Sequence, residues 1–210
     1  MNKKIAPLQF ITPDLADKNQ LEKLVYDVCK NGCRWVQLRL KKCSDNDFLE
    51  IGKSIRRITE TFKASLIVND RVHLVEKINA DGVHIGKNDM PVLEARKIIG
   101  SNKIIGATAN TLNDCLQHIN NKVDYIGLGP YRFTNTKKNL SPVLGIDGYK
   151  TILEQLPKNH LPIIAIGGIQ LEDLKLLLEV GLSGIAVSSS LSKNPNEIKS
   201  WLKEIEDFHN

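Results

Sequence analysis

The stretch "DGVHIGKNDMPVLEARKIIGSNKIIGAT", residues 81–108, sets a segment of helical spacing between two short apolar runs. The outer runs, DGVHIG and NKIIGAT, have the continuous apolar character of parallel strands that are buried on both faces. The middle, MPVLEARKIIG, spaces its apolar residues near 3.6 apart and closes on Gly100, a residue typical of helix ends. Parallel strands need a crossover between them, so this stretch predicts one strand–helix–strand unit.

The same alternation runs along the whole chain. Eight apolar runs begin at Leu8, Trp35, Ser65, Asp81, Asn102, Asp124, Leu161 and Ser183. Segments of helical spacing separate them, for example QLEKLVYDVCK and LEDLKLLLEVG. Eight strands alternating with helices predict an α/β fold, a (β/α)8 TIM barrel that forms a single domain over residues 1–210. An open, doubly wound sheet is the alternative interpretation.

Composition and charge narrow the kind of partner. With 41% hydrophobic and 25% charged residues, the chain has the make-up of an ordinary globular protein. Its net charge of +5 is spread without a long basic block, which favours small anionic substrates over nucleic acid. The start, MNKKIAPLQFITPDL, holds only a short apolar run broken by prolines. We therefore expect neither a signal peptide nor a membrane span, and a cytoplasmic location.

Cationic side chains end the second apolar run. Gln37, Arg39 and Lys41 stand at alternate positions of WVQLRLKK, which places them on one face of a strand. Helices cover the outer face of barrel strands, and the active sites of such barrels lie at the carboxyl ends of the strands. Two neighbouring cations repel each other unless they share an anion. These side chains therefore predict an anion site at that end of the barrel.

Carboxylates follow the next two runs. Asn69 and Asp70 end SLIVND, and Asp89 follows DGVHIG. On the same rim as the cationic pair, two carboxylates predict ligands for Mg²⁺, which proteins commonly hold with one or two carboxylates and substrate phosphates. For Asp89 a second interpretation is open, the N-cap of a helix that starts near Met90. His84, which would end the fourth run, is interpreted as a packed histidine rather than a base.

Small and hydroxyl-bearing residues follow the later runs. They are Thr108 after the fifth run, the loop from Thr134 to Lys138 after the sixth, Gly167 and Gly168 after the seventh, and Ser188 to Ser190 after the eighth. Backbone N–H groups after strands seven and eight form the usual phosphate site of TIM barrels. Together with the anion site after strand two, they imply two phosphorylated substrates at one barrel mouth. That combination is typical of a transferase.

The order of these motifs resembles one family, thiamine phosphate synthase, also called thiamine phosphate pyrophosphorylase. The matching motifs are QLRLK, VNDR, DGVHIGKND, YIGLGP with TNTKK, AIGGI and the final Ser pair, and they span nearly the whole chain. The resemblance implies an enzyme that joins an aminopyrimidine methyl diphosphate to a thiazole phosphate, giving thiamine phosphate and pyrophosphate. It also implies Mg²⁺ as the cofactor and two small phosphorylated substrates as the partners.

The resemblance implies a role for each matching position. Gln37, Arg39, Lys41 and Asn69 would hold the pyrimidine diphosphate, Asp70 and Asp89 would bind Mg²⁺, and Thr134, Thr136, Gly168, Ser188 and Ser189 would hold the thiazole phosphate. Lys137 would reach the departing pyrophosphate, so the catalytic residues would be Lys137, Arg39, Lys41 and Thr108. The implied mechanism is dissociative: the diphosphate leaves first, and the thiazole nitrogen attacks the pyrimidine methyl cation.

Two positions depart from the family pattern. Thr108 stands where the family usually has Ser, and it keeps a hydroxyl for the pyrimidine or the diphosphate. Arg132 stands where a small or apolar residue is expected, and it either adds phosphate affinity or points outward. Neither change removes a group that the implied mechanism needs.

Two other functions compete with the synthase. A thiazole tautomerase of the same fold relies on a His in the region of Asn110, and this chain has none there. A non-catalytic regulatory protein that binds thiamine precursors would not need both anion sites. The sequence leaves open whether the thiazole carries a carboxylate and whether the chain forms a homo-oligomer.

Overall fold

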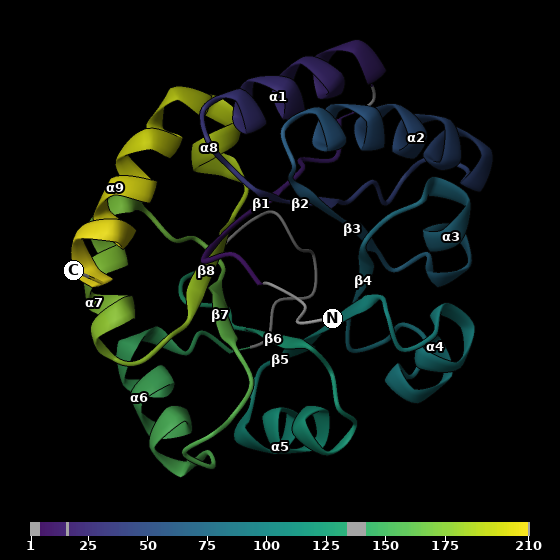
Figure 1. The fold of residues 1–210 in the computed structure, drawn as a ribbon. Helices are drawn as coiled ribbons and strands as arrows, with labels where there is room; N and C mark the ends of the chain where they lie inside the picture. The colour runs from purple at the N-terminus through teal and green to yellow at the C-terminus, as the bar shows by residue number, and fades with distance from the viewer. Residues whose placement is uncertain (1–4, 16, 134–141, 210) are drawn as a thin grey trace.

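A closed barrel forms the centre of the molecule, with helices in a ring around it (Figure 1). The computed structural model describes residues 5–15, 17–133 and 142–209. Eight parallel strands pair in chain order, and the last strand pairs with the first, Gln9 opposite Ala186. The predicted (β/α)8 TIM barrel is thereby confirmed, and the open sheet is wrong.

Each predicted apolar run forms one strand. The strands are β1 (Leu8–Ile11), β2 (Trp35–Leu38), β3 (Ser65–Asn69), β4 (Gly82–Ile85), β5 (Ile104–Ala109), β6 (Tyr125–Leu128), β7 (Ile163–Ile166) and β8 (Gly184–Val187). They are short, and β2 ends before Arg39 and Lys41. These two cations therefore lie just past the strand, at the rim of the barrel, and not on the strand itself.

Helices cover the outside of the barrel (Figure 1). They are α1 (Lys18–Lys30), α2 (Asp45–Thr61), α3 (Val75–Ile78), α4 (Val92–Ile99), α5 (Leu112–Asn120), α6 (Gly145–Gln155), α7 (Leu174–Glu179), α8 (Ser189–Lys193) and α9 (Ile198–His209), with 3-10 turns η1 (Val72–Leu74), η2 (Leu171–Asp173) and η3 (Pro195–Glu197). Side-chain caps set some of their starts: Thr111 and Asp114 form a capping box on α5. None of the helices in the described ranges has both the length and the apolar composition needed to cross a membrane.

The buried apolar side chains form two clusters, one outside the barrel strands and one inside the barrel. The larger one fills the layer between strands and helices and includes Trp201. The smaller one lies inside the barrel and consists of Ile11, Trp35, Ile67, Ile104, Tyr125, Ile164 and Ala186. Trp35 meets Tyr125 edge to face there, with ring centroids 4.8 Å apart. These side chains fill part of the barrel interior.

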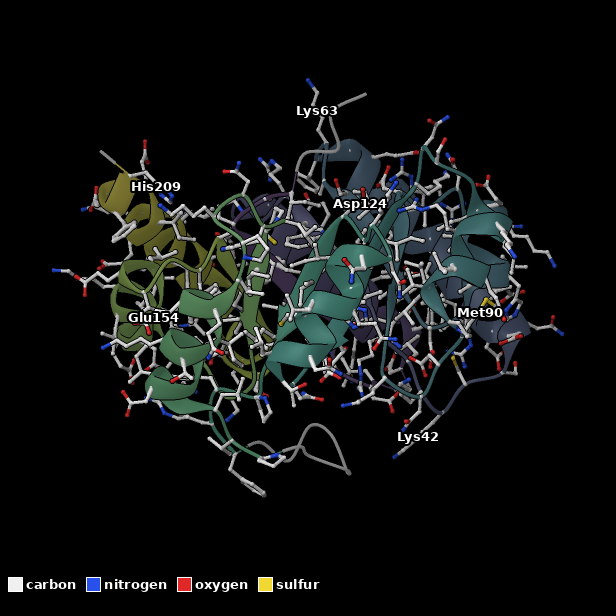
Figure 2. All side chains as sticks on the ribbon, turned by 90° about the horizontal axis from the view of Figure 1, so that it is seen from below. Lys42, Lys63, Met90, Asp124, Glu154 and His209 are labelled. Carbon is white, nitrogen blue, oxygen red and sulfur yellow. The ribbon has the colours of Figure 1, made fainter. Side chains whose placement is uncertain are left out.

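The two ends can be told apart in Figure 2. Lys63 and Asp124, which precede β3 and β6, lie at the upper end of the view, and Lys42, which follows β2, lies at the lower end. The carboxyl ends of the strands therefore face downward in this view. In a TIM barrel that is the end on which the chemistry is built.

Candidate functional site

A cavity of about 470 Å³ opens at the carboxyl ends of the strands. The predicted site residues that line it are Gln37, Arg39, Lys41, Asn69, Asp89, Thr108, Gly168, Ser188 and Ser189. Asp70 lies next to them, in contact with Lys41 and Asp89. Thr134, Thr136 and Lys137 lie outside the described residues. Residues from six different strand ends thus converge on one cavity.

Two cationic side chains on one wall of this cavity differ in their ion pairing: within the described residues Lys41 has a carboxylate partner and Arg39 has none. Lys41 Nζ lies 2.5 Å from Asp70 Oδ2. The Arg39 guanidinium has no carboxylate partner among residues 5–15, 17–133 and 142–209, while its backbone N–H donates to Thr12 Oγ1 at 2.8 Å. Thr12, the residue after β1, thus fixes the backbone that carries the guanidinium. An uncompensated guanidinium on a cavity wall is well suited to bidentate binding of a phosphate group.

Two carboxyl groups meet where β3 and β4 end. Asp70 and Asp89 hydrogen-bond to one another. Burial of Asp89 and its bond with Asp70 raise the pKa of Asp89 to about 6. Burial also disfavours the charged form of Asp70, but the hydrogen bonds with Asp89 and Lys41 outweigh it and lower the pKa of Asp70. The pair is therefore a place where added positive charge would be stabilising.

The donor set fits a hard divalent cation. Within the described ranges no group of three or more His, Cys, Asp or Glu side chains could hold a metal ion, so the protein offers the two carboxylates alone. Mg²⁺ is commonly held in this way, with substrate phosphates and water completing its shell. Asp70 also has a φ of 75°, a left-handed backbone that is strained for a residue with a Cβ. Strain of this kind concentrates at functional sites.

The structure decides between the two interpretations of Asp89. Helix α4 begins at Val92 with Pro91 as its N-cap residue, and no side chain caps it. Asp89 Oδ2 instead accepts the backbone N–H of Gly86 at 2.7 Å. The helix-cap interpretation is therefore wrong, and the carboxyl group is held at the cavity by the loop that follows β4.

Small residues and hydroxyl groups form the opposite wall, after β7 and β8. Gly168 has a φ of 68°, and a Cβ there would lie 3.0 Å from Arg132 Cβ and 3.2 Å from the backbone oxygen of Phe133. The loop therefore requires glycine in both conformation and space. Ser188 and Ser189 follow β8, and their hydroxyl groups make no hydrogen bond within the described part of the chain. These hydroxyls are available to a ligand in the cavity.

Arg132 is an exposed residue whose guanidinium is already paired within the protein. Its guanidinium forms a two-pronged ion pair with the buried carboxylate of Asp173 and lies 4.8 Å from the centroid of the Tyr131 ring. Backbone bonds add to this contact, since Arg132 N–H donates to Gly167 O at 2.9 Å. The residue thus ties the segment after β6 to the loop after β7. Asp173, its partner, was missed at the sequence level because nothing local links the two positions.

The barrel interior holds further polar residues that the sequence analysis missed. Gln9 and Tyr125 are buried there, and they connect to His84. His84 is a packed histidine, as predicted, with 8% of its surface exposed, but it also lines the cavity and contacts Thr108. A signal was present for Gln9, whose amide interrupts the apolar run LQFI at a position that faces inward.

Comparisons with known proteins identify the family of this chain. The family model described as "Thiamine monophosphate synthase" matches residues 8–191. The thiamine-phosphate synthase of Flavobacterium johnsoniae is 43% identical over 202 residues, which cover 95% of this chain and 94% of that protein. The thiamine-phosphate synthase of Phocaeicola vulgatus is 45% identical over 199 residues, which cover 93% and 95%. A solved structure, "Thiamine phosphate pyrophosphorylase from Pyrococcus furiosus", matches with a TM-score of 0.83 and 30% identity over 97% of this chain and 96% of that one. The chain belongs to the thiamine monophosphate synthase family.

Proposed function

We propose that this chain joins 4-amino-2-methyl-5-pyrimidinylmethyl diphosphate to a thiazole phosphate, giving thiamine phosphate and pyrophosphate, with residues 1–210 acting as one catalytic domain. The observation that carries the proposal is the pairing of two separate anion-binding walls in one cavity. Arg39 and Lys41 lie on one wall, and Gly168, Ser188 and Ser189 lie on the other. A transfer between two phosphorylated substrates needs both.

Departure of the diphosphate is the step that the cationic wall assists. The bond between the pyrimidine methylene carbon and the diphosphate oxygen breaks, and its electron pair leaves with pyrophosphate. Arg39, Lys41 and Lys137 would face the charge that develops on those oxygens, and preorganised donors of this kind stabilise the transition state. Asp70 and Asp89 would hold Mg²⁺, whose chemistry in such sites is to neutralise charge on phosphate oxygens.

Bond formation needs no nucleophile from the protein. The electron-donating 4-amino group of the pyrimidine supports the methyl cation left behind. The thiazole nitrogen then supplies the electron pair of the new carbon–nitrogen bond. Gln37 and Asn69, both buried at strand ends on the cavity wall, would orient the pyrimidine. The serine and glycine wall would orient the thiazole through its phosphate, so that the two reacting atoms meet.

A direct assay tests the proposed function. Purified protein is supplied with both phosphorylated precursors and Mg²⁺, and thiamine phosphate and pyrophosphate are measured together. The two products should form in equal amounts and only when both precursors are present. If pyrophosphate is released from the pyrimidine substrate but no thiamine phosphate appears, the proposed transfer is wrong.

Ser189→Ala should affect the thiazole substrate above all. Loss of one hydroxyl donor to its phosphate is expected to raise the KM for thiazole phosphate about tenfold with little change in kcat. Steady-state kinetics with each substrate varied in turn measures this. Ser192→Ala is the matched control, because Ser192 lies on the same short helix but bonds to the backbone oxygen of Ser188 and does not line the cavity. A Ser189 variant with unchanged KM would remove this residue from the phosphate site.

Lys137→Ala should be slow but should still bind both substrates. An ammonium group that meets pyrophosphate most strongly as its charge develops stabilises the transition state more than the ground state. We therefore expect kcat and kcat/KM to fall together by about tenfold or more. Lys138→Ala is the control and should be nearly silent, since the family resemblance gives a role to Lys137 and none to Lys138. Equal small effects in both variants would mean that both lysines are merely solvated charges.

The tautomerase alternative finds no support at the position on which it depends. Asn110 donates its side-chain amide to the backbone oxygen of Gly129, so it holds the loop after β6. A buried or rim histidine in its place would be the expected proton carrier. The two neighbouring cations, Arg39 and Lys41, suit a diphosphate substrate, and the tautomerase substrate carries no diphosphate.

A further inference from the structure

A chain of hydrogen-bonded side chains crosses the barrel interior beneath the cavity. Gln37 Nε2 donates to Gln9 Oε1 at 3.1 Å, and Gln9 Nε2 donates to the Tyr125 hydroxyl at 3.3 Å. On the other side, His84 Nδ1 lies 2.9 Å from the same hydroxyl, and His84 Nε2 lies 3.0 Å from Thr108 Oγ1. Both ends of the chain, Gln37 and Thr108, line the cavity. The interior is therefore connected to the site through Gln9, Tyr125 and His84, which the mechanism above does not use.

The donors and acceptors along this chain favour one direction. Gln9 Nε2 already donates to the Tyr125 hydroxyl, and the buried hydroxyl proton needs an acceptor of its own, for which His84 Nδ1 at 2.9 Å is the partner within the described residues. A ring nitrogen that accepts a hydrogen bond carries no proton, and in the neutral ring the proton then lies on Nε2. Nε2 therefore donates to Thr108 Oγ1. The Thr108 hydroxyl thus keeps its own proton for a different acceptor.

We propose that His84 is a positioning residue: Tyr125 holds it in the tautomer protonated on Nε2, and this turns the Thr108 hydroxyl into a donor for a ligand in the cavity. The acceptor would be an oxygen or a ring nitrogen of the phosphorylated pyrimidine, so the inference rests on the function proposed above. Thr108, which stands where the family usually has serine, would thus donate its hydroxyl proton to the ligand. A β-branched side chain has few χ1 rotamers, which keeps this hydroxyl in place.

The packing around the two rings holds them in position. A Cβ on Gly106 would lie 2.0 Å from Tyr125 Cζ, and a Cβ on Gly127 would lie 3.0 Å from His84 Cε1. The rings therefore occupy space that these glycines leave open. Burial raises the pKa of Tyr125, which keeps its hydroxyl protonated and able to donate. In such an enclosed, low-dielectric interior an unpaired donor is costly, so the chain holds its direction.

The first test reads the tautomer in substrate-free protein by nitrogen NMR of the five histidine rings. The His84 signals are identified by their loss in His84→Asn. We expect a protonated Nε2 and an unprotonated Nδ1 in the native protein, and a mixture of tautomers in Tyr125→Phe. A proton on Nδ1 in the native protein would overturn the proposal, because the chain would then run in reverse and consume the Thr108 proton. This measurement does not depend on enzyme activity.

The second test asks whether Tyr125 acts through Thr108. Tyr125→Phe should lower kcat about tenfold, the size of one hydrogen bond, but much less when Thr108 is already Val. Tyr149→Phe is the matched control, because Tyr149 is equally buried and its hydroxyl donates to Leu128 O at 2.7 Å, away from His84. Additive losses, or an equal loss in Tyr149→Phe, would overturn the proposal. Absence of thiamine phosphate with the native protein would reject the proposed function instead and leave the NMR result standing.

Discussion

Asp70→Asn and Asp89→Asn should each lower Mg²⁺-dependent turnover by about 10²–10³-fold, the size expected when one preorganised charge is lost from a site of this kind. The two carboxyl groups contact each other and form the anionic part of the cavity rim. Removing either leaves a single carboxylate for the cation. Initial rates measured over a Mg²⁺ titration should reach a lower maximum, and the half-maximal rate should need a higher Mg²⁺ concentration.

The same variants have a second readout that separates chemistry from folding. Asp89→Asn should leave Tm in metal-free protein unchanged or higher, because it removes one of two like groups in contact and an amide oxygen can still accept the Gly86 N–H. Asp114→Asn is the matched control: this carboxylate in the first turn of α5 pairs with Lys87 at 3.1 Å but does not line the cavity. Its turnover should stay near that of the native protein. Full activity with lower Tm in Asp89→Asn would contradict the metal role.

Arg39→Ala should reduce kcat/KM for the pyrimidine diphosphate by about 10²-fold. The guanidinium lines the cavity without a carboxylate partner in the described ranges, so its charge is available to a phosphate group. Arg39→Lys should recover part of the loss, because an ammonium keeps the charge but not the two-pronged geometry. Inorganic pyrophosphate binding, followed by calorimetry, should weaken in parallel.

The control for this charge is a surface arginine. Arg57 lies exposed on α2, outside the barrel, and Arg57→Ala should leave both substrates unaffected. Because the two walls are proposed to bind different substrates, Arg39→Ala should leave the KM for thiazole phosphate nearly unchanged. If Arg39→Ala and Ser189→Ala affected both substrates equally, the two walls would be one anion site.

Strand periodicity explains how much of the site could be predicted from the sequence. In a parallel barrel every strand points the same way, so the residues that follow the apolar runs must meet at one rim. Arg39, Asn69 and Thr108 were placed correctly by that argument alone. The role of Asp89 was ambiguous, because it follows the fourth apolar run, where a metal ligand is expected, and also precedes the next helix, where a cap is expected. Only the backbone path through Pro91 separates them.

The contacts between distant positions could not be predicted in this way. Arg132 and Asp173 are 41 positions apart, and Gln9 and Tyr125 are 116 apart. Each pair meets only because the barrel closes and brings different strands or loops together. Periodicity fixes which face a side chain occupies, but it does not fix which side chain lies opposite. Buried polar partners across a closed sheet therefore need the three-dimensional structure.

The backbone conformation of Asp70 is unfavourable for folding, although its carboxylate is the group proposed to bind the metal. Its backbone φ of 75° disfavours a residue with a Cβ by roughly 1 kcal/mol, and glycine would adopt it without that cost. Selection for a stable fold therefore acts against a carboxylate at this position, and the metal-binding role proposed for Asp70 would make selection for thiamine synthesis act in its favour. In cells that take up thiamine from their surroundings the second pressure is absent. Substitutions that relax the backbone are then the ones expected to accumulate at residue 70.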